Sequence, residues 1–301
     1  MPTRHHLQTR ALAINVVRRF FLDRDYLEVD TPVRLPSLLP EAHIDPVASE
    51  NWFLQTSPEQ CMKRLLSAGH QRIFQICKTF RKAERGKKHL PEFSMLEWYR
   101  AGAGYVDLMA ETEALVRFVA EQLGTGNTLC YQGAAIDLSP DWPAMTVAQA
   151  FERYTDQTLE QAVKTGSFDE RIGCDIEPEL GLDRPVFLYD YPAATGAAFA
   201  RQKAADPAVV ERFELYIGGL ELCNGFSELT GAAAYEERFK QEESRRTGRG
   251  LAPLPRPKQF LSDMERMPEA AGNALGIDRL VMLFCDATTI DDVVAFPPER
   301  L

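Results

Sequence analysis

Residues 74–99 constrain what this chain can fold into more than any other stretch. From Phe74 to Arg81 apolar and polar residues alternate, and they alternate again from Phe93 to Tyr99. This period of two is typical of strands whose two faces meet different surroundings. The segment between them carries five basic side chains, Lys82, Arg85, Lys87, Lys88 and His89. The sequence therefore predicts two strands joined by a basic loop.

Several side chains of this predicted hairpin suit a flat, anionic ligand such as a nucleotide. Arg81 ends the first strand on its open face, and Phe93, Met95, Glu97 and Tyr99 share one face of the second strand. An arginine can bind phosphate through two parallel hydrogen bonds, and aromatic rings can stack on a base. An ordinary hairpin with a solvated basic turn explains the same composition equally well, so both interpretations stay open at this point.

The order of residues in the hairpin carries a family resemblance. Phe-Arg, a charged loop and then His-Leu-Pro-Glu-Phe-Ser-Met-Leu-Glu-Trp-Tyr resembles motif 2 of class II aminoacyl-tRNA synthetases, and the lysine-type branch is the nearest match. The resemblance implies that Arg81 bridges the substrate carboxylate and the α-phosphate of ATP, that His89 reaches the outer phosphates and that Phe93 stacks on adenine. The family often has Asn-Glu after the arginine, whereas residues 82–84 are Lys-Ala-Glu. The adenine contact of that glutamate therefore stays open.

Composition excludes several classes of protein. A chain of 301 residues, 45% hydrophobic and 26% charged, can build a sizeable core as one large domain or two small ones. The net charge of −10 argues against broad, non-specific nucleic-acid binding, although a local basic patch remains compatible with it. No apolar run approaches the roughly 20 residues of a membrane span, and the N-terminus lacks a signal-peptide core. We therefore expect a cytoplasmic protein without membrane contact.

Cysteine and histidine usage argues against disulfides and transition metals. Six cysteines are scattered without a Cys-x-x-Cys pair, and five histidines have no metal-ligand spacing. We expect reduced, mostly buried thiols.

The N-terminal region predicts a helix and a short strand. Residues 7–22 place apolar side chains at helical spacing, and residues 26–33 follow as a strand that ends at Pro32. Helix, strand and proline in this order resemble motif 1 of the same family, at about residues 14–34, which implies a homodimer interface. A plain helix-to-strand connection is the alternative. The predicted apolar stripe consists of Leu7, Ala11, Ile14, Val17 and Phe21.

A second helix is predicted to begin at residues 57–59, Ser-Pro-Glu. Serine suits the N-cap and proline the first helical position. Leu65 and Leu66 then fall on the buried side, with Lys63 and Arg64 facing solvent. The segment resembles the family stretch whose glutamate helps to bind the substrate amine, which implies that role for the glutamate of this segment, Glu59. A partner of the helix dipole is the alternative.

Other stretches carry less information. Residues 36–50 suit a loop that could cover a site, and residues 105–123 suit a packing helix. Residues 124–185 are mixed, with a short helix near Val147–Tyr154. Residues 232–250 predict a helix with a dense basic run, which is either solvated surface or a docking face for a macromolecular acceptor.

Residues 212–229 predict a hairpin that turns at Gly218-Gly219. A two-residue turn places Glu214 diagonally across from Glu221 on the same face, where two carboxylates can share a hard cation. Two solvated surface glutamates are the alternative. The resemblance implies that both bind the Mg²⁺ ions that accompany ATP.

The second strand of this hairpin requires a break in its period. Strict alternation turns Asn224, Phe226 and Glu228 away from Glu221, whereas the family's Asn-Gly-Phe-x-Glu-Leu segment lines the same pocket. We expect a bulge at Gly225 that re-aims the following side chains. Glu228, with Tyr99 beside it, is then implied as the buried anion that holds a substrate ammonium group.

Residues 270–284 predict a glycine-rich strand that leads into an apolar helix, and they resemble motif 3. Arg279 then lies at the helix start, where the resemblance implies a contact with the γ-phosphate. Lysyl-tRNA synthetases have glycine where this chain has Ala274, and the added methyl could favour an amine displaced by one carbon. The substrate-binding residues implied by the resemblance are Glu59, Arg81, Glu97, Tyr99, Asn224, Phe226, Glu228 and Ala274.

Together these motifs, with motif 2 at about residues 72–100, predict the fold class and the reaction. We expect one α+β catalytic domain over residues 1–301, with a mostly antiparallel class II synthetase-like sheet flanked by helices. The implied reaction is ATP-dependent formation of an aminoacyl-adenylate, with Arg81 and Arg279 as catalytic residues and ATP and Mg²⁺ as cofactors. No side-chain nucleophile is needed, because the substrate carboxylate itself attacks phosphorus.

Length indicates the acceptor of the acyl group. Only about 20 residues precede motif 1, whereas an anticodon-binding domain needs on the order of 100. We therefore expect a catalytic domain without that module. It resembles the protein-modifying branch of the family, which attaches (R)-β-lysine, or lysine, to a lysine of elongation factor P, with a homodimer and no tRNA as partners. A truncated enzyme that acylates tRNA or a small molecule is the alternative, as is a non-catalytic paralogue that binds ATP or an amino acid.

Overall fold

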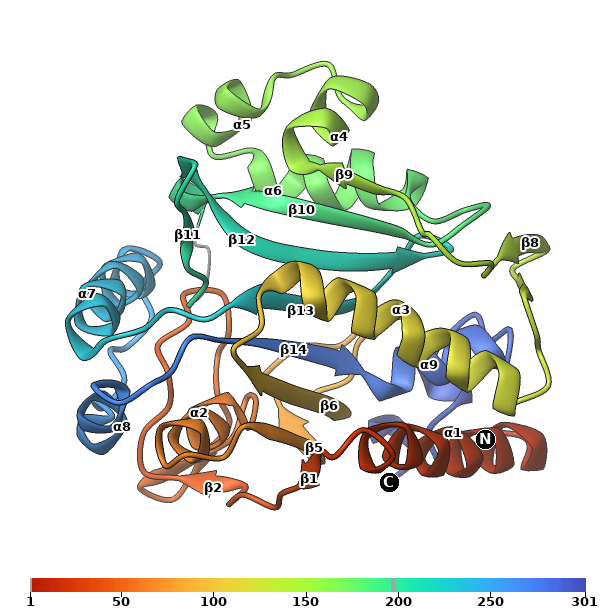
Figure 1. Cartoon of the computed structure of the whole chain (residues 1–301), viewed down its shortest axis with the longest axis horizontal. Helices are drawn as coiled ribbons and strands as arrows, with labels where there is room; N and C mark the ends of the chain where they lie inside the picture. Colours follow the sequence, from red (N-terminus) through yellow and green to blue (C-terminus); the bar gives the residue numbers. More distant parts are fainter. Residues whose placement is uncertain (1, 196–198) are drawn as a thin grey trace.

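A large, mostly antiparallel sheet forms the centre of the molecule (Figure 1). The computed structural model describes residues 2–195 and 199–301, and within them this sheet has nine strands. In spatial order the strands are β1 (Leu27–Glu28), β5 (Arg72–Phe80), β6 (Glu92–Ala101), β14 (Ala270–Gly276), β13 (Leu220–Ser227), β12 (Asp206–Ile217), β10 (Val186–Pro192) and β9 (Ala144–Thr146), with β11 (Gln202–Lys203) paired to β12. The pairs from β5 to β10 are antiparallel, and only the edge strands β1 and β9 pair in parallel.

Helices cover both faces of the sheet, which confirms the predicted α+β class. One face packs against α1 (Arg4–Leu22), α3 (Tyr105–Gln122) and α9 (Ile277–Phe284). The other face packs against α2 (Glu59–Ser67), α4 (Val147–Tyr154), α5 (Leu159–Thr165), α6 (Phe168–Arg171), α7 (Ala232–Gly248) and α8 (Lys258–Met264). None of these helices, over the described ranges, combines the length and apolar character needed to cross a membrane.

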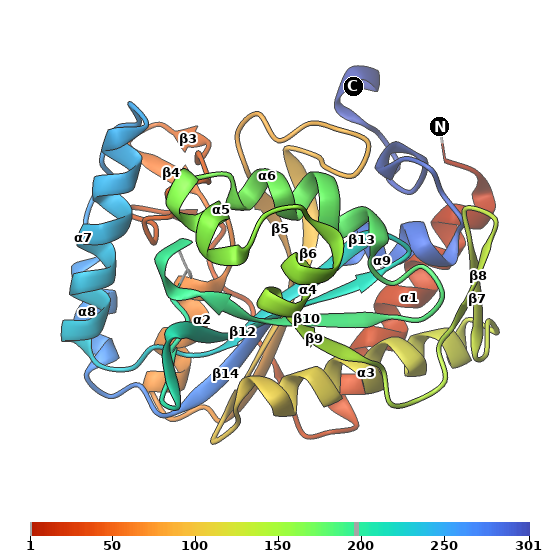
Figure 2. The ribbon, with the colours of Figure 1, turned by 90° about the horizontal axis from the view of Figure 1, so that it is seen from above.

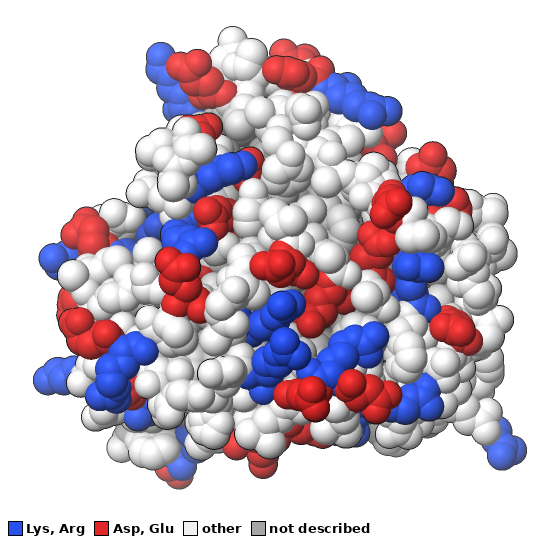
Figure 3. All heavy atoms as spheres, in the orientation of Figure 1, with Lys and Arg blue, Asp and Glu red and all other residues white. Residues whose placement is uncertain are grey.

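Two small sheets lie outside the central one. One has the order β2 (Arg34–Leu35), β4 (Trp52–Leu54) and β3 (Ala48–Ser49), and the other pairs β7 (Thr128–Tyr131) with β8 (Ala134–Asp137). The region from 124 to 185 that carried little sequence signal thus forms β7 to β9 and α4 to α6, followed by single helical turns at Ile172–Ile176 and Glu177–Glu179. On the face seen in Figure 3 basic and acidic side chains are interspersed, without a continuous basic surface over the described residues drawn there.

The motif 2 hairpin forms as predicted. β5 and β6 pair in an antiparallel register that places Cys77 opposite Met95 and Gln75 opposite Glu97. Leu96 and Trp98 enter the core beneath α1 and α3. The other face of β6, which carries Glu97 and Tyr99, was expected to be open. This prediction was wrong, because α2 and the segments around it cover that face and leave the two side chains 2% and 3% exposed.

The N-terminal helix forms, but its buried stripe is rotated from the predicted one. Leu7 and Ala11 are exposed, because the helix packs through its other side chains against α3, α9 and the sheet. The predicted strand over 26–33 is reduced to the two residues of β1. The residues buried on α1 are Ala13, Val16, Val17, Phe20 and Phe21.

The turn at Gly218-Gly219 is confirmed, and both glycines take the left-handed backbone that this tight hairpin requires (φ +61° and +68°). A break in the strand period also occurs, but not at Gly225. The register shifts between Tyr216, which pairs with Glu221, and Leu215, which pairs with Cys223, so Leu222 is the extra residue. Gly225 is instead needed for packing, since a Cβ there would lie 2.5 Å from the Phe213 ring.

Near its end, the basic run on α7 makes contacts within the protein. Arg246 is 2% exposed and donates to the backbone carbonyls of Glu41 (2.9 Å) and Ile44 (2.7 Å). Arg249 bonds His43 Nδ1 at 2.6 Å. Figure 2 shows α7 beside β3 and β4. Through these bonds α7 holds the loop between β2 and β3, residues 36–47, which is part of the stretch 36–50 expected to cover a site.

Candidate active site

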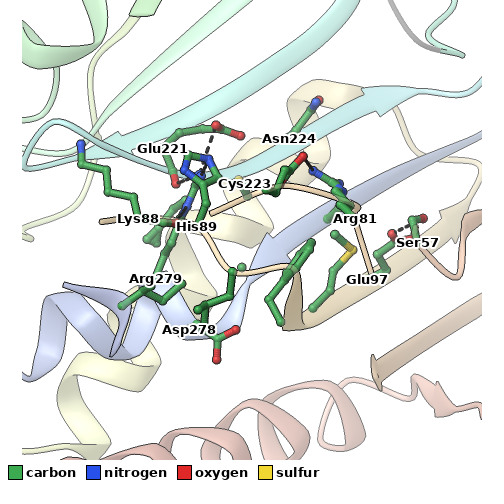
Figure 4. Close-up of a pocket in the computed structure, with 18 of the residues that line it drawn as sticks. Ser57, Arg81, Lys88, His89, Glu97, Glu221, Cys223, Asn224, Asp278 and Arg279 are labelled. Carbon is green, nitrogen blue, oxygen red and sulfur yellow. Dashed lines mark hydrogen bonds and ion pairs between the residues drawn. The ribbon is translucent and has the colours of Figure 1, made fainter. Parts of the chain in front are cut away.

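One pocket collects most of the residues singled out in the sequence. It opens on the face of the sheet that carries α2, between β6, β13 and β14 and the motif 2 loop (Figure 4). The predicted residues that line it are Glu59, Arg81, His89, Phe93, Glu97, Glu221, Asn224, Phe226, Ala274 and Arg279. Three predicted residues, Tyr99, Glu214 and Glu228, do not line it.

Cationic groups gather at one end of the pocket (Figure 4). Arg279, near the start of α9, donates to the backbone carbonyl of Glu221 at 2.8 Å and contacts His89 Nε2 at 2.6 Å. Burial and the charge of Arg279 lower the pKa of His89. Lys88 of the motif 2 loop donates to the carbonyl of Gly219 at 2.7 Å. This end can therefore bind an anion such as a chain of phosphates.

Arg81 lies farther along the pocket, between an aromatic ring and a carboxylate. Its guanidinium carbon is 5.2 Å from the centre of the Phe93 ring, and Nη1 is 3.6 Å from Glu84 Oε1. Ala83 takes a left-handed backbone (φ +61°), a turn that brings Glu84 into the pocket lining. The Lys-Ala-Glu departure from the family pattern thus still supplies a carboxylate to the pocket.

Glu214 does not line the pocket, and its carboxylate is bonded to side chains beside it. Its carboxylate accepts hydrogen bonds from Arg212 (2.5 Å), Tyr191 (2.5 Å) and Tyr216 (2.6 Å). Tyr216 pairs with Glu221, so Glu214 lies diagonally across from Glu221 on the same face as predicted, and the bulge at Leu222 places Asn224 directly opposite Glu214. Across the described residues no group of three histidine, cysteine or carboxylate side chains is arranged to hold a metal.

A buried lysine connects two of the predicted substrate carboxylates. Lys63 is fully buried, pairs with Glu59 and lies 2.6 Å from Glu228 Oε2. The prediction that Lys63 faces solvent was therefore wrong. Although burial alone lowers the pKa of Lys63, the two carboxylates raise it well above its ordinary value, so Lys63 is charged. Its ammonium also lies 5.1 to 5.6 Å from the rings of Phe199, Phe226 and Tyr235.

The start of α2 differs by one residue from the prediction. The helix begins at Glu59 with Pro58 as N-cap. Ser57 still supports it, because its hydroxyl accepts from the Glu59 N–H at 2.9 Å. The same hydroxyl donates to Glu97 Oε1 at 2.6 Å, and Tyr99 donates to Glu97 Oε2 at 3.0 Å. Burial and the charge of Glu59 nevertheless raise the pKa of Glu97 to about 8.

The remaining wall of the pocket comes from β13 and β14. Ala274 pairs with Glu97 on one side and with Asn224 on the other, so its methyl group stands between these two side chains. The shift at Leu222 turns Asn224 and Phe226 toward the pocket with Glu221. The side chains after the bulge thus share one face, as the family pattern requires.

Sequence reasoning missed several groups in or near the pocket. Lys88 was noticed only as part of a charged loop, and the position of Glu84 relative to the pocket was left open. Asp278 also lines it and binds both Arg10 of α1 and the Ser94 N–H (2.7 Å), which ties motif 3 to α1 and to motif 2. Glu41 reaches it from the covering loop, and no local pattern distinguishes this residue from the other polar residues of that loop.

Comparisons with known proteins agree with this geometry. Residues 2–300 match the family model described as tRNA synthetases class II (D, K and N). The chain is 38% identical to the elongation factor P–(R)-β-lysine ligases of Edwardsiella ictaluri and Vibrio atlanticus. It is 37% identical to the ligase of the same name from Salmonella arizonae. Each match covers 98% of this chain and 95% or 96% of the relative.

Proposed function

The chain belongs to the class II tRNA synthetase family of the D, K and N type, and on that basis we propose the following reaction for it. It is an ATP-dependent ligase that activates (R)-β-lysine, or lysine, as an aminoacyl-adenylate and transfers the acyl group to a lysine side chain of elongation factor P. The observation that carries this proposal is one pocket with cationic side chains at one end and carboxylates at the other.

In the activation step a carboxylate oxygen of the amino acid attacks the α-phosphorus of ATP, and the bond to pyrophosphate breaks. We assign Arg81 to the reacting carboxylate and α-phosphate, His89 and Arg279 to the outer phosphates, and Phe93 to the adenine ring. These residues act by positioning the reactants and by neutralising the charge that develops on phosphate oxygens. Their mutual contacts hold them in place before the substrate arrives.

Magnesium is part of the proposal, but the residues fit it only in part. Carboxylate oxygens are the ligands that Mg²⁺ prefers in proteins. Glu221 lines the pocket and holds a single cation, Arg279, at 3.2 Å, so it can bind a metal together with the phosphates. Glu214 is already bonded through both of its oxygens, so we give it a supporting role at most.

The amino acid occupies the other end of the pocket. We propose that its ammonium groups lie among the carboxylates of Glu59, Glu97 and Glu228, and that Tyr99, Asn224 and Phe226 shape this end. Glu59 and Glu228 already share the Lys63 ammonium, so Glu97 is the member of this set without a cation. Ala274 narrows the same end by one methyl group relative to glycine, which suits a displaced amine.

Exchange and transfer assays test the proposed function. We expect ATP-pyrophosphate exchange that depends on (R)-β-lysine or lysine, followed by acylation of elongation factor P and not of tRNA. Absence of exchange with both amino acids would contradict the enzyme assignment. Efficient charging of tRNA would contradict the acceptor.

We also propose a homodimer built on the motif 1 region. Three leucines of α1 and two side chains just after it are exposed, although apolar side chains of this size are usually buried. They are Leu7, Leu12, Leu22, Leu27 and Val33. Sedimentation analysis is expected to give twice the chain mass of 33.9 kDa, and a Leu27→Asp variant is expected to shift toward the monomer. A monomeric wild-type protein at micromolar concentration would exclude this interface.

A further inference from the structure

Arg212 lies behind the pocket wall and carries a charge that the proposed reaction does not use. It is on β12, its side chain is 17% exposed, and it does not line the pocket. Burial alone would lower the pKa of Arg212, but the neighbouring Glu214 raises it above its ordinary value, so the guanidinium is charged. Burying such a charge is costly, so the groups that it contacts indicate what it is for.

Three contacts fix the Arg212 side chain. Nη2 donates to Glu214 Oε1 at 2.5 Å, and Nε donates to Asn224 Oδ1 at 3.1 Å. The guanidinium carbon lies 4.3 Å from the centre of the Tyr191 ring. Because Glu214 is directly opposite Asn224 in the strand register, Arg212 reaches Asn224 diagonally across one face of the sheet. Arg212 thus joins a carboxylate outside the pocket to a side chain of the pocket wall.

The contact with Arg212 determines which way the Asn224 amide faces. A guanidinium group can only donate hydrogen bonds, so the atom of Asn224 that faces it is the oxygen. The Nδ2 group of Asn224, which can only donate, makes no hydrogen bond to any residue that the structure describes. Asn224 lines the pocket together with Arg81 (Figure 4). The amide therefore offers the pocket a donor, which suits an anionic oxygen and does not suit an ammonium group.

We propose that Arg212 is a positioning residue, which holds the Asn224 amide so that its Nδ2 group donates to an anionic oxygen of the reactants. That oxygen belongs either to the amino-acid carboxylate or to the α-phosphate, the two groups that we assign to Arg81. This inference rests on the proposed function and adds a residue to it. Without Arg212 the amide can turn about its last side-chain bond, and its oxygen would then face these anions. Since Arg212 does not line the pocket, its effect on the reaction passes through Asn224.

Arg212→Lys tests the proposal, because lysine keeps the positive charge beside Glu214 but cannot make both bonds in the fixed geometry of a guanidinium. In ATP-pyrophosphate exchange we expect kcat/KM to fall by about 10-fold, the effect of one misplaced hydrogen bond to a charged group. In an Asn224→Ala background the same substitution is expected to change kcat/KM by less than about twofold, since its target is already gone. A rise in the KM of the amino acid alone identifies the carboxylate as the partner of Asn224, and a rise in the KM of ATP alone identifies the α-phosphate.

Asn224→Asp tests the amide orientation and leaves Arg212 unchanged. Aspartate keeps an oxygen toward the guanidinium but places a second, negatively charged oxygen where the donor was. We expect kcat/KM of this variant to be at least about 10-fold below that of Asn224→Ala, because the added charge repels the reacting anions. Equal or higher activity of Asn224→Asp would overturn the proposal, even if Arg212→Lys failed to fold.

Arg201→Lys is the matched control. Arg201 also holds glutamates, Glu211 at 2.8 Å and Glu269 at 3.6 Å, but both lie outside the pocket, so this variant should stay within about twofold of the wild type. The proposal is wrong if Arg212→Lys folds and keeps the wild-type kcat/KM, or if it loses as much activity in the Asn224→Ala background as alone. Absence of exchange by the wild type would overturn the proposed function and the inference with it. Wild-type exchange with additive losses would overturn the inference alone.

Discussion

Replacing Arg81 by alanine is expected to lower the rate of amino-acid activation by about 1,000-fold or more. Positioned donors at a reacting phosphate or acyl oxygen contribute effects of about this size, because they act where charge develops in the transition state. Arg81 is the one residue that we assign to both reactants, the amino-acid carboxylate and the α-phosphate. The measurement is ATP-pyrophosphate exchange at saturating amino acid, with kcat and KM determined separately.

Lys78→Ala provides the matched control for Arg81. Lys78 lies three residues before Arg81, on β5, but its side chain is 48% exposed and its partner is Glu92, at 3.4 Å, outside the pocket. Exchange by this variant should stay within about twofold of the wild type, since exposed ion pairs contribute little. An Arg81→Ala enzyme with exchange within tenfold of the wild type would remove Arg81 from the reacting centre.

Replacing Lys63 by methionine is expected to lower the free energy of unfolding by about 3–5 kcal/mol, the usual cost of breaking a buried ion pair. The fully buried ammonium of Lys63 is the shared partner of Glu59 and Glu228, and methionine would leave two uncompensated carboxylates next to each other. Urea denaturation followed by circular dichroism measures the change. The same variant should also activate the amino acid poorly, since its carboxylates would take up protons rather than bind ammonium groups.

A double variant distinguishes charge from packing at this position. Adding Glu228→Gln to Lys63→Met removes one of the two carboxylates left behind, so part of the lost stability should return. The effects of the two substitutions are then far from additive. Additive losses would mean that the methylene stem of Lys63, rather than its charge, matters for folding.

Local sequence patterns predicted the structure correctly where a feature lies within a single strand, turn or helix. The alternation on either side of the motif 2 loop, the Gly218-Gly219 turn and the strand-to-helix step before Arg279 all appear as predicted. These features depend on residues that are neighbours in the sequence, so a local pattern is enough to predict them. Ten of the 21 residues that line the pocket could be named in advance for the same reason, since they belong to these motifs.

The remaining differences depend on contacts between distant segments. A periodicity argument assigns a charged helical residue such as Lys63 to solvent, because it cannot include Glu228, which is contributed by the end of β13. The position of the bulge likewise follows from packing across the sheet, where Phe213 leaves no room for a side chain at Gly225. Glu41 was missed because the arginine that holds its loop is about 200 positions away on α7.

The extra residue at Leu222 limits which mutations this enzyme can accept during evolution. It lets one strand serve both halves of the reaction, with Glu221 before the bulge on the phosphate side and Asn224 after it on the amino-acid side. Deleting a single residue there would restore strict alternation and turn the following side chains into the core, because register has a period of two. Substitutions can therefore change the phosphate side or the amino-acid side of the pocket separately. A change in the length of β13 would alter both sides at once.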